Sequence, residues 1–251
     1  MSYTLFISDL HLDPARPEHL DALEKLLAEH AGKADALYVL GDLFEAWIGD
    51  DDDTPFNLDA IAAFRQFSDS GSKLYFMHGN RDFMLGNDFA TACGGTLLDE
   101  GTVVDLYGTD AILMHGDSLC TLDTAYQQFR TMARNPQWQQ GMLAKPLEER
   151  RMIAQGMRMQ SQGNNANKAE NIMDVTPEEV VREMQDAGVK HLIHGHTHRP
   201  DVHDVALPDG TGKRWVLGDW GKLGWQIVAV SYTHLRAHET VLDLVCRLLL
   251  E

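Results

Sequence analysis

Short apolar runs rich in β-branched and aromatic residues recur along the chain, and helical patterns separate the first three of them. The runs that predict strands are Tyr3–Ser8, Ala36–Leu40, Lys73–Met77, Ala111–Met114, His191–His194, Trp215–Leu217 and Trp225–Val230. The helical patterns are Glu18–His30, where leucines return at three- and four-residue spacing, and Phe56–Ser70. Strands that alternate with helices indicate βαβ units around a central sheet, so the fold class is α/β.

Two local signals refine this prediction. Residues 102–114 are typical of a hairpin that turns at a Gly-Thr-Asp sequence, so the sheet is expected to be mixed. A helix is predicted over 177–187, with Thr176 as its N-cap, Glu179 completing a capping box and Gly188 ending it.

From about residue 121 to 174 the alternation of strands and helices stops. This stretch has helical patterns at Asp123–Arg134 and Leu147–Gln160, shows no strand pattern and holds six of the 11 methionines. We interpret 121–174 as a helical insertion into a core formed by 1–120 and 175–230. Methionines at helical spacing serve core packing or adaptable binding of apolar ligands, and the sequence leaves both open.

The charge balance argues against nucleic acid as a partner. The chain has a formal net charge of −17, whereas phosphate backbones are bound by Lys and Arg surfaces. Residues 120–170 differ, with seven Lys or Arg against four Asp or Glu. This segment carries either ordinary mixed surface charge or a face directed at something anionic.

The remaining bulk features predict a cytoplasmic protein. No apolar run reaches the roughly 18 residues of a membrane span, and the N-terminus lacks the pattern of a secretory signal. The three cysteines are not in CxxC spacing, which argues against a disulfide framework or a zinc knuckle.

Five short polar motifs end or follow predicted strands. They are Asp9-Leu10-His11, Gly41-Asp42, Gly79-Asn80-Arg81-Asp82, His115-Gly116-Asp117 and Gly195-His196-Thr197-His198. In open α/β sheets ligands bind outside the carboxyl ends of the strands, so these loops are expected to converge on one site. Two residues apart on an extended segment, the members of each D-x-H or H-x-H pair point the same way.

The side chains of these motifs suit a pair of divalent cations. Imidazoles and carboxylates bind Mn, Fe, Co, Ni or Zn, and the absence of thiolate ligands disfavours a structural zinc site. A shared carboxylate can bridge two cations about 3.5–4 Å apart, and Asp42 is our candidate for that bridge. A single motif of this kind more often caps a turn than binds metal, but five at successive strand ends make chance a poor explanation.

The order D-x-H, G-D, G-N-[HR]-[DE], H-G-D and G-H-x-H resembles the calcineurin-like metallophosphoesterase superfamily over residues 9–198. The resemblance implies a two-sheet β-sandwich flanked by helices, here with an inserted helical cap, and a dinuclear centre. It implies one metal on Asp9, His11, Asp42 and His198. It implies a second on Asp42, Asn80, His115 and His196.

Arg81 departs from the many superfamily members that have a histidine at this position. A histidine could act as a general acid, but an arginine cannot, because its pKa stays above about 12. Arg81 is instead suited to bidentate contacts with phosphate oxygens. A leaving group that is itself a phosphate has less need of a proton donor, so the motif favours a pyrophosphate bond.

With the loop Leu40–Asp51 and the helical insertion, the pattern is similar to the branch of the superfamily that hydrolyses UDP-2,3-diacylglucosamine in lipid A biosynthesis. That resemblance implies attack at the α-phosphorus to give UMP and 2,3-diacylglucosamine 1-phosphate, with two Mn²⁺ ions and with Asn80, Arg81, His115 and His196 in catalysis. It implies a cap that binds acyl chains and sugar. Contact with the inner membrane is expected to be peripheral and through the cap, because no segment spans. The oligomeric state stays open, with a monomer favoured. The implied substrate contacts are Asn80, Arg81, Asp123, Ser161, Asn165, Lys168 and His196.

Without the resemblance, the cap residues have ordinary explanations. The stretch 161–168 is rich in Asn and Gly and is typical of a loop between helices. Asp123 is typical of a first-turn carboxylate that faces a helix dipole.

The segment 231–251 does not fit the family pattern, which would continue with a closing strand after residue 230. We interpret it as a non-family tail resembling a translated cloning adapter, and exclude it from the site.

Two other functions compete with the pyrophosphatase. One keeps the metals but acts as a phosphodiesterase or phosphatase on another nucleotide or phosphoester. The other is a non-catalytic scaffold, which would be expected to have lost ligands, whereas all seven are present.

Overall fold

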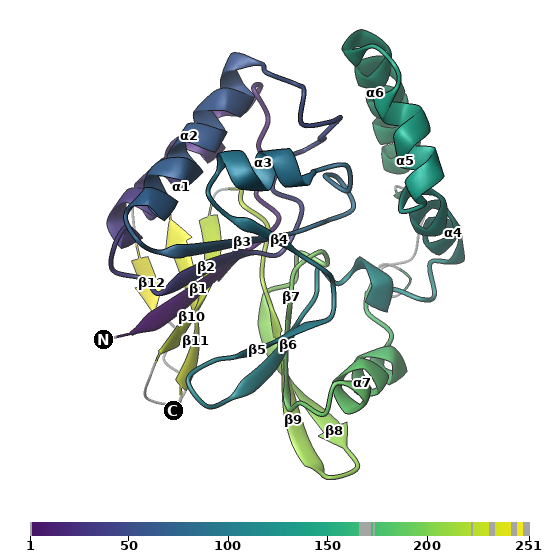
Figure 1. Ribbon diagram of the computed structural model, residues 1–251. Helices are drawn as coiled ribbons and strands as arrows, with labels where there is room; N and C mark the ends of the chain where they lie inside the picture. Colours follow the sequence, from purple (N-terminus) through teal and green to yellow (C-terminus); the bar gives the residue numbers. More distant parts are fainter. Residues whose placement is uncertain are drawn as a thin grey trace.

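The protein is built from two β-sheets packed face to face with helices on both outer sides (Figure 1). The computed structural model describes residues 2–165, 172, 174–221, 223–230, 234–241 and 245–247. For residues 162, 164, 165, 234–241 and 245–247 only the backbone is described. Within the described residues, none of the helices combines the length and hydrophobicity that crossing a bilayer requires.

The first sheet has seven strands in the order β12-β11-β10-β1-β2-β3-β4. They are β1 (Tyr3–Ile7), β2 (Ala36–Val39), β3 (Lys73–Met77), β4 (Thr96–Leu98), β10 (Leu223–Val230), β11 (His234–Val241) and β12 (Val245–Arg247). Strands β1 to β4 are parallel, and β10 joins β1 in antiparallel register with Tyr3 opposite Val230. Strand β11 pairs antiparallel with β10, so a strand lies beside β10 even though its sequence does not follow the family pattern.

The second sheet has five strands in the order β5-β6-β7-β9-β8. They are β5 (Thr102–Asp105), β6 (Asp110–Leu113), β7 (His191–His194), β8 (Asp201–Leu207) and β9 (Gly210–Val216). Strands β6, β7 and β9 are parallel, while β5 and β8 pair antiparallel at the two edges. The predicted hairpin of β5 and β6 and the mixed character of the sheets are both confirmed.

Alternation along the strands explains the layers. In β1, Phe6 faces the second sheet and packs with Leu113 and Ile193, whereas Leu5 faces the helices. The helices on that outer side are α1 (Pro17–His30), α2 (Pro55–Asp69) and α3 (Asn87–Ala92). On the far side, α7 (Pro177–Asp186) covers the second sheet, with its buried Met184 in the same apolar cluster as Leu192.

A short 3₁₀ turn and three helices follow β6, and the three helices form the cap beside the sandwich (Figure 1). They are η1 (Asp117–Leu119), α4 (Thr124–Ala133), α5 (Pro136–Leu143) and α6 (Leu147–Asn165). The helical pattern over 147–160 is confirmed, but α6 continues through residues 161–165, where the Asn- and Gly-rich sequence predicts a loop. The separate helix α5 begins at a proline that follows the N-cap Asn135, whose side chain accepts from Gln137 N at 2.9 Å.

Arginines of the cap bond to acidic and carbonyl groups of the core. Arg150 donates to the Ile48 carbonyl at 2.7 Å and to Asp51 Oδ1 at 2.8 Å, and Arg130 Nε donates to Asp117 Oδ2 at 3.0 Å. These contacts account for much of the basic excess in residues 120–170. The anionic surface that this segment faces includes the protein's own core.

The N-terminus of α7 differs from its prediction. Thr176 is the N-cap, but its hydroxyl makes no capping bond and instead pairs with Thr121 Oγ1 at 2.7 Å. Glu179 pairs with Arg182 on the same helix rather than completing a capping box. The hydrogen bond between Thr176 and Thr121, at the start of the cap, therefore replaces the expected capping bond within α7.

Candidate metal centre

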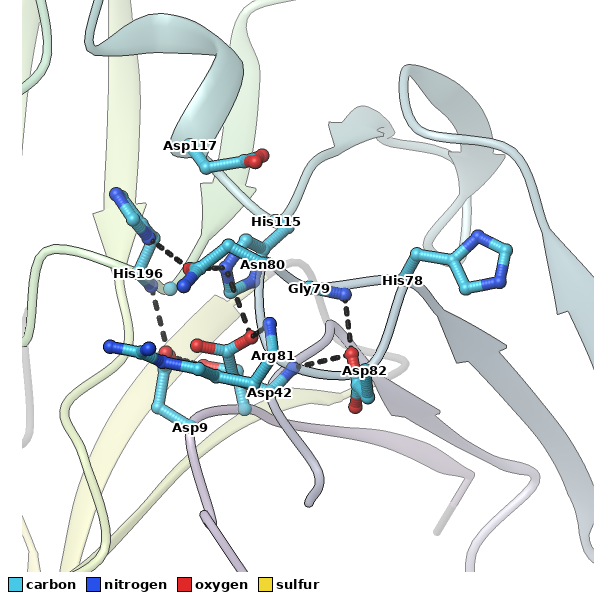
Figure 2. A network of polar contacts seen from close by, with 12 residues as sticks. Asp9, Asp42, His78, Gly79, Asn80, Arg81, Asp82, His115, Asp117 and His196 are labelled. Atoms are coloured by element: carbon cyan, nitrogen blue, oxygen red, sulfur yellow. Dashed lines mark hydrogen bonds and ion pairs between the residues drawn. The ribbon is translucent and has the colours of Figure 1, made fainter. Parts of the chain in front are cut away.

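The five polar motifs lie together at one end of the sandwich. They follow the carboxyl ends of β1, β2 and β3 in the first sheet and of β6 and β7 in the second, so both sheets contribute to one cluster. Figure 2 shows side chains from all five loops turned toward one another. The structure thus brings together all seven residues predicted as ligands.

The backbone of this cluster has an unusual conformation. Six non-glycine residues among those described have positive φ, and five of them are predicted ligands: Asp9, His11, Asp42, His196 and His198, with φ between 48° and 65°. This left-handed region costs ordinary L-residues of order 1 kcal/mol. Such conformations concentrate at sites where geometry serves function.

Glycines allow the loops to approach the ligands closely. A Cβ on Gly79 would lie 2.1 Å from Asp42 Oδ1, and one on Gly195 would lie 2.1 Å from Asp9 Oδ2. Because real Cβ atoms essentially never come this close, any side chain at these positions would displace a carboxylate. These two glycines therefore permit the backbone to approach both carboxylates closely.

The first group of donors comes from the D-x-H and H-x-H motifs. His198 Nε2 lies 3.3 Å from both Asp9 Oδ1 and His11 Nε2, and His11 Nε2 lies 3.9 Å from Asp42 Oδ2. Burial lowers the pKa of His11 to about 3, which keeps its imidazole neutral with a lone pair to donate.

The second group lies on the other side of Asp42. His115 Nε2 is 3.7 Å from Asp42 Oδ1 and 3.0 Å from Asn80 Oδ1, and His196 Nδ1 is 2.8 Å from the same amide oxygen. His115 Nδ1 donates to the Leu40 carbonyl at 2.8 Å, so Nε2 is the ring nitrogen that faces the cluster and can bind a cation once it is deprotonated. One oxygen of Asp42 therefore faces each group, as the predicted bridge requires.

These donors fit divalent cations. Asp9 and Asp42 are buried, and neither forms an ion pair with Lys or Arg among the described residues. Asp9 Oδ1 is buried without a hydrogen bond among the described residues. A buried carboxylate oxygen without a donor is unfavourable alone and favourable beside a cation. Asp9 takes part in both carboxylate–histidine groups of metal-binding geometry, Asp9-His11-His198 and Asp9-Asp42-His115, so it also lies between the two positions.

Two supporting residues were not selected from the sequence. Buried Asp82 accepts from the backbone N–H groups of Gly79 and Leu43, each at 2.7 Å, and so ties the Asn80 loop to the Asp42 loop. Ser8 Oγ donates to Asp9 Oδ2 at 2.5 Å. The position of Asp82 at the end of the Gly79–Asp82 motif could have indicated it, because an acidic residue in a motif can hold the loop in place without binding metal.

Other polar residues near the motifs lie outside the cluster. His78 points away and its Nε2 contacts the Leu85 carbonyl at 2.6 Å (Figure 2). Asp117 pairs with Arg130 and Tyr126 of α4, so it anchors the cap. Tyr126 in turn stacks on His196, with ring centroids 6.1 Å apart. No local sequence pattern predicts this contact.

A cleft of about 560 Å³ extends from the predicted ligands to side chains of the cap. Five predicted ligands and Arg81 line it together with polar cap residues that include Asp123, Arg158 and Ser161. The apolar side chains of its wall are Trp47, Ile48, Phe83, Met84, Phe129, Trp138, Met142 and Met157. Buried Met142 also belongs to the apolar core, so core packing is confirmed for this methionine, and binding of apolar ligands stays a prediction.

The predicted cap contacts are only partly described. Asp123 and Ser161 line the cleft. Asp123 is also the N-cap of α4, where its carboxylate accepts from Tyr126 N at 3.1 Å. The side chain of Asn165 and all of Lys168 lie outside the described residues.

Comparison with known proteins places this geometry in a family. The sequence profile of the calcineurin-like phosphoesterases matches residues 3–200, which include all five motifs. The chain belongs to the calcineurin-like phosphoesterase family. The metal-dependent phosphoesterase fold expected from the motifs is thereby confirmed, and divalent cations are the cofactors of this family.

Curated relatives share about half of the sequence. A UDP-2,3-diacylglucosamine hydrolase of Cellvibrio japonicus is 53% identical over 222 residues, 88% of this chain and 92% of that protein. One of Marinobacter nauticus is 51% identical over 226 residues, 90% of this chain and 93% of the relative. One of Chromohalobacter salexigens is 52% identical over 226 residues, 89% of this chain and 92% of the relative.

Proposed function

We propose that this protein hydrolyses the diphosphate of UDP-2,3-diacylglucosamine at the α-phosphorus, releasing UMP and 2,3-diacylglucosamine 1-phosphate for lipid A biosynthesis. The observation that carries the proposal is the cleft whose wall combines five of the seven predicted ligands, His11, Asp42, Asn80, His196 and His198, with apolar side chains beneath the cap. A substrate with a diphosphate between a nucleoside and two acyl chains has the same division into anionic and apolar parts. The names of the curated relatives support the same reaction.

We propose that Asp9, His11, Asp42 and His198 bind one cation and that Asp42, Asn80, His115 and His196 bind the other. The pair, with Mn²⁺ as the proposed metal, would acidify a water molecule and neutralise charge on the attacked phosphoryl group. Backbone groups of other loops fix the two carboxylates: Arg81 N donates to Asp42 Oδ1 at 2.8 Å, and His196 N donates to Asp9 Oδ2 at 2.9 Å. Asp42 and Asp9 would thereby keep the two cations in place.

Arg81 is suited to bind the diphosphate. It lines the cleft beside the metal ligands, and its Nε is buried without a hydrogen-bond partner among the described residues. A guanidinium with a free donor in a desolvated position gains most from a phosphate oxygen. Asn80 and His196 complete the contacts proposed for the diphosphate.

The test is hydrolysis of the acylated sugar nucleotide in ¹⁸O-labelled water with Mn²⁺. We expect release of UMP carrying the label, because attack at the α-phosphorus places the new oxygen there. Label in the sugar phosphate would contradict the position of attack. Turnover of a generic phosphodiester without UMP release from the acylated substrate would favour the phosphodiesterase instead.

The proposed sugar contacts Asp123, Ser161, Asn165 and Lys168 have a separate test. Lys168→Ala is expected to raise KM for the acylated substrate with little change in kcat, since the residue lies away from the metals in sequence and is proposed only to bind. Asp42→Ala is expected to abolish turnover. An equal loss of kcat in both variants would contradict the division between binding and catalysis.

We propose that the cap also makes peripheral contact with the membrane that holds the acyl chains. Of the seven large apolar side chains that are exposed among the described residues, five belong to the cap: Leu122, Met132, Leu143, Met152 and Met159. Met152 and Met159, seven residues apart, share one face of α6. Flotation with phospholipid vesicles should recover the protein, and Met152→Asp/Met159→Asp should reduce that recovery.

A further inference from the structure

Glu45 lies where the cap meets the metal ligands. The loops 9–12 and 41–45 run side by side and are joined by backbone hydrogen bonds from His11 N to Asp42 O at 3.0 Å, from Leu12 N to Leu43 O at 2.8 Å and from Glu45 N to Leu12 O at 3.0 Å. The backbone of Glu45 is therefore fixed relative to that of His11.

The side chain of Glu45 faces the ring of this ligand. Its Oε2 lies 3.4 Å from His11 Nδ1, which is buried and makes no hydrogen bond within the described chain. Arg16 reinforces the pair, since its Nη2 lies 3.4 Å from Glu45 Oε2 and donates to the His11 carbonyl at 2.9 Å. A carboxylate opposite Nδ1 favours the tautomer with hydrogen on Nδ1 and leaves the Nε2 lone pair for a cation.

The other oxygen of Glu45 belongs to the cap. Arg158, on α6, forms an ion pair with Glu45 Oε1, and the Glu45 side chain is only 16% exposed. A continuous polar path therefore leads from α6 through one carboxylate to a predicted ligand. Arg151 provides a contrast, because it pairs α6 with Asp52 by an ion pair that reaches no ligand.

We propose that Glu45 is a positioning residue for His11 and that Arg158 couples the docking of α6 to metal affinity at the Asp9–His11–His198 position. The inference rests on the proposed function in taking His11 as a ligand. It adds that the cap contributes to holding the metal, beyond enclosing the substrate. Outer partners of this kind typically change metal affinity by about 10–100-fold when removed.

The test measures binding of Mn²⁺ alone to the metal-depleted full chain, by the electron paramagnetic resonance signal of free Mn²⁺ and by calorimetry. Glu45→Gln and Arg158→Ala are each expected to weaken one of two sites by about 10–100-fold and to leave the other unchanged. Arg151→Ala, the matched loss of a cap–core ion pair, is expected to bind both ions as the unaltered protein does.

Each outcome bears on a separate part of the inference. Normal affinity at both sites in Glu45→Gln overturns the positioning role, and a loss in Arg151→Ala equal to that in Arg158→Ala overturns the specific coupling. Arg158 is partly exposed, so Arg158→Ala tests the coupling even if Glu45→Gln fails to fold. The assay also tests the proposed function separately. If the unaltered protein binds fewer than two Mn²⁺ ions, the proposed function is contradicted, whereas the inference on Glu45 and Arg158 is judged only from the differences between the variants and the unaltered protein.

Discussion

At the scale of single residues, the centre depends on short side chains held by backbone groups. Asp9 and Asp42 each accept a backbone N–H from another motif, and Asp82 accepts two more from the loops around them. Every loop that carries a ligand is thus fixed by a neighbouring loop as well as by its own strand. A change at one motif is therefore expected to affect ligands in another.

Asp42→Asn tests the bridging carboxylate with little change in shape. The variant keeps the size and hydrogen-bond acceptor of the side chain but removes the charge shared by the two cations, so we expect at least a 100-fold loss of kcat, of the order seen when one electrostatic contact is removed. Metal analysis should show fewer than two ions bound. Asp105→Asn, at an exposed position of β5, should behave as the unaltered protein.

Gly195→Ala tests the close approach beside Asp9. Its Cβ would lie 2.1 Å from Asp9 Oδ2 and 2.2 Å from Ser8 Oγ, so we expect about 1–3 kcal/mol of lost stability together with weaker metal binding. Gly156→Ala is the control, since nothing lies within 4 Å of that position inside α6. The control should gain about 0.5–1 kcal/mol, and thermal unfolding measures both.

At the scale of elements, the strands, helices α1 and α2, and the β5–β6 hairpin could be predicted because their patterns are local. The short β4 and α3 were missed because few residues carry their periodicity. The edge strand β8 has seven residues but only one buried side chain, Val205, so it lacks an apolar run, and helix α5 was also missed. The capping box failed because Thr176 bonds to Thr121, a partner 55 residues away that no local pattern reveals.

Helix α6 is expected to depend on Arg150 for docking. The residue is 2% exposed and bonds both the carbonyl of buried Ile48 and the exposed Asp51, so Arg150→Ala leaves the Ile48 carbonyl without its donor, at a cost of about 1–3 kcal/mol. Limited proteolysis should then cut the cap faster than in the unaltered protein. Arg182→Ala, which removes pairs on the surface of α7, should leave the cleavage rate unchanged.

At the scale of the whole molecule, the site joins the two sheets. Predicted ligands that follow β1, β2 and β3 meet predicted ligands that follow β6 and β7, so the proposed cations would hold the sandwich together at one end. The sequence predicted this convergence through strand ends. It could not predict the cap contacts of Tyr126, Arg130 and Glu45, because these depend on how α4 and α6 lie on the core.

Metal removal is therefore expected to lower the melting temperature of the entire protein. A ligand at 100 times its Kd stabilises by about 2.7 kcal/mol, which corresponds to about 5–10 °C for a chain of this size. Differential scanning calorimetry with Mn²⁺ and with a chelator measures the shift. An unchanged melting temperature in a preparation shown to exchange its metal would contradict the proposed site.

The left-handed backbone at five predicted ligands restricts which residues each position accepts. Asp, Asn and His enter that conformation more readily than other side chains, and they are also the residues that offer oxygen or nitrogen to a cation. Conformation and chemistry thus select the same few amino acids. A glutamate or cysteine introduced at one of these five positions to alter metal preference would have to adopt the left-handed backbone conformation as well as bind the metal. Substitutions that change the metal are therefore more readily made at Asn80 and His115, which are not among the residues with positive φ.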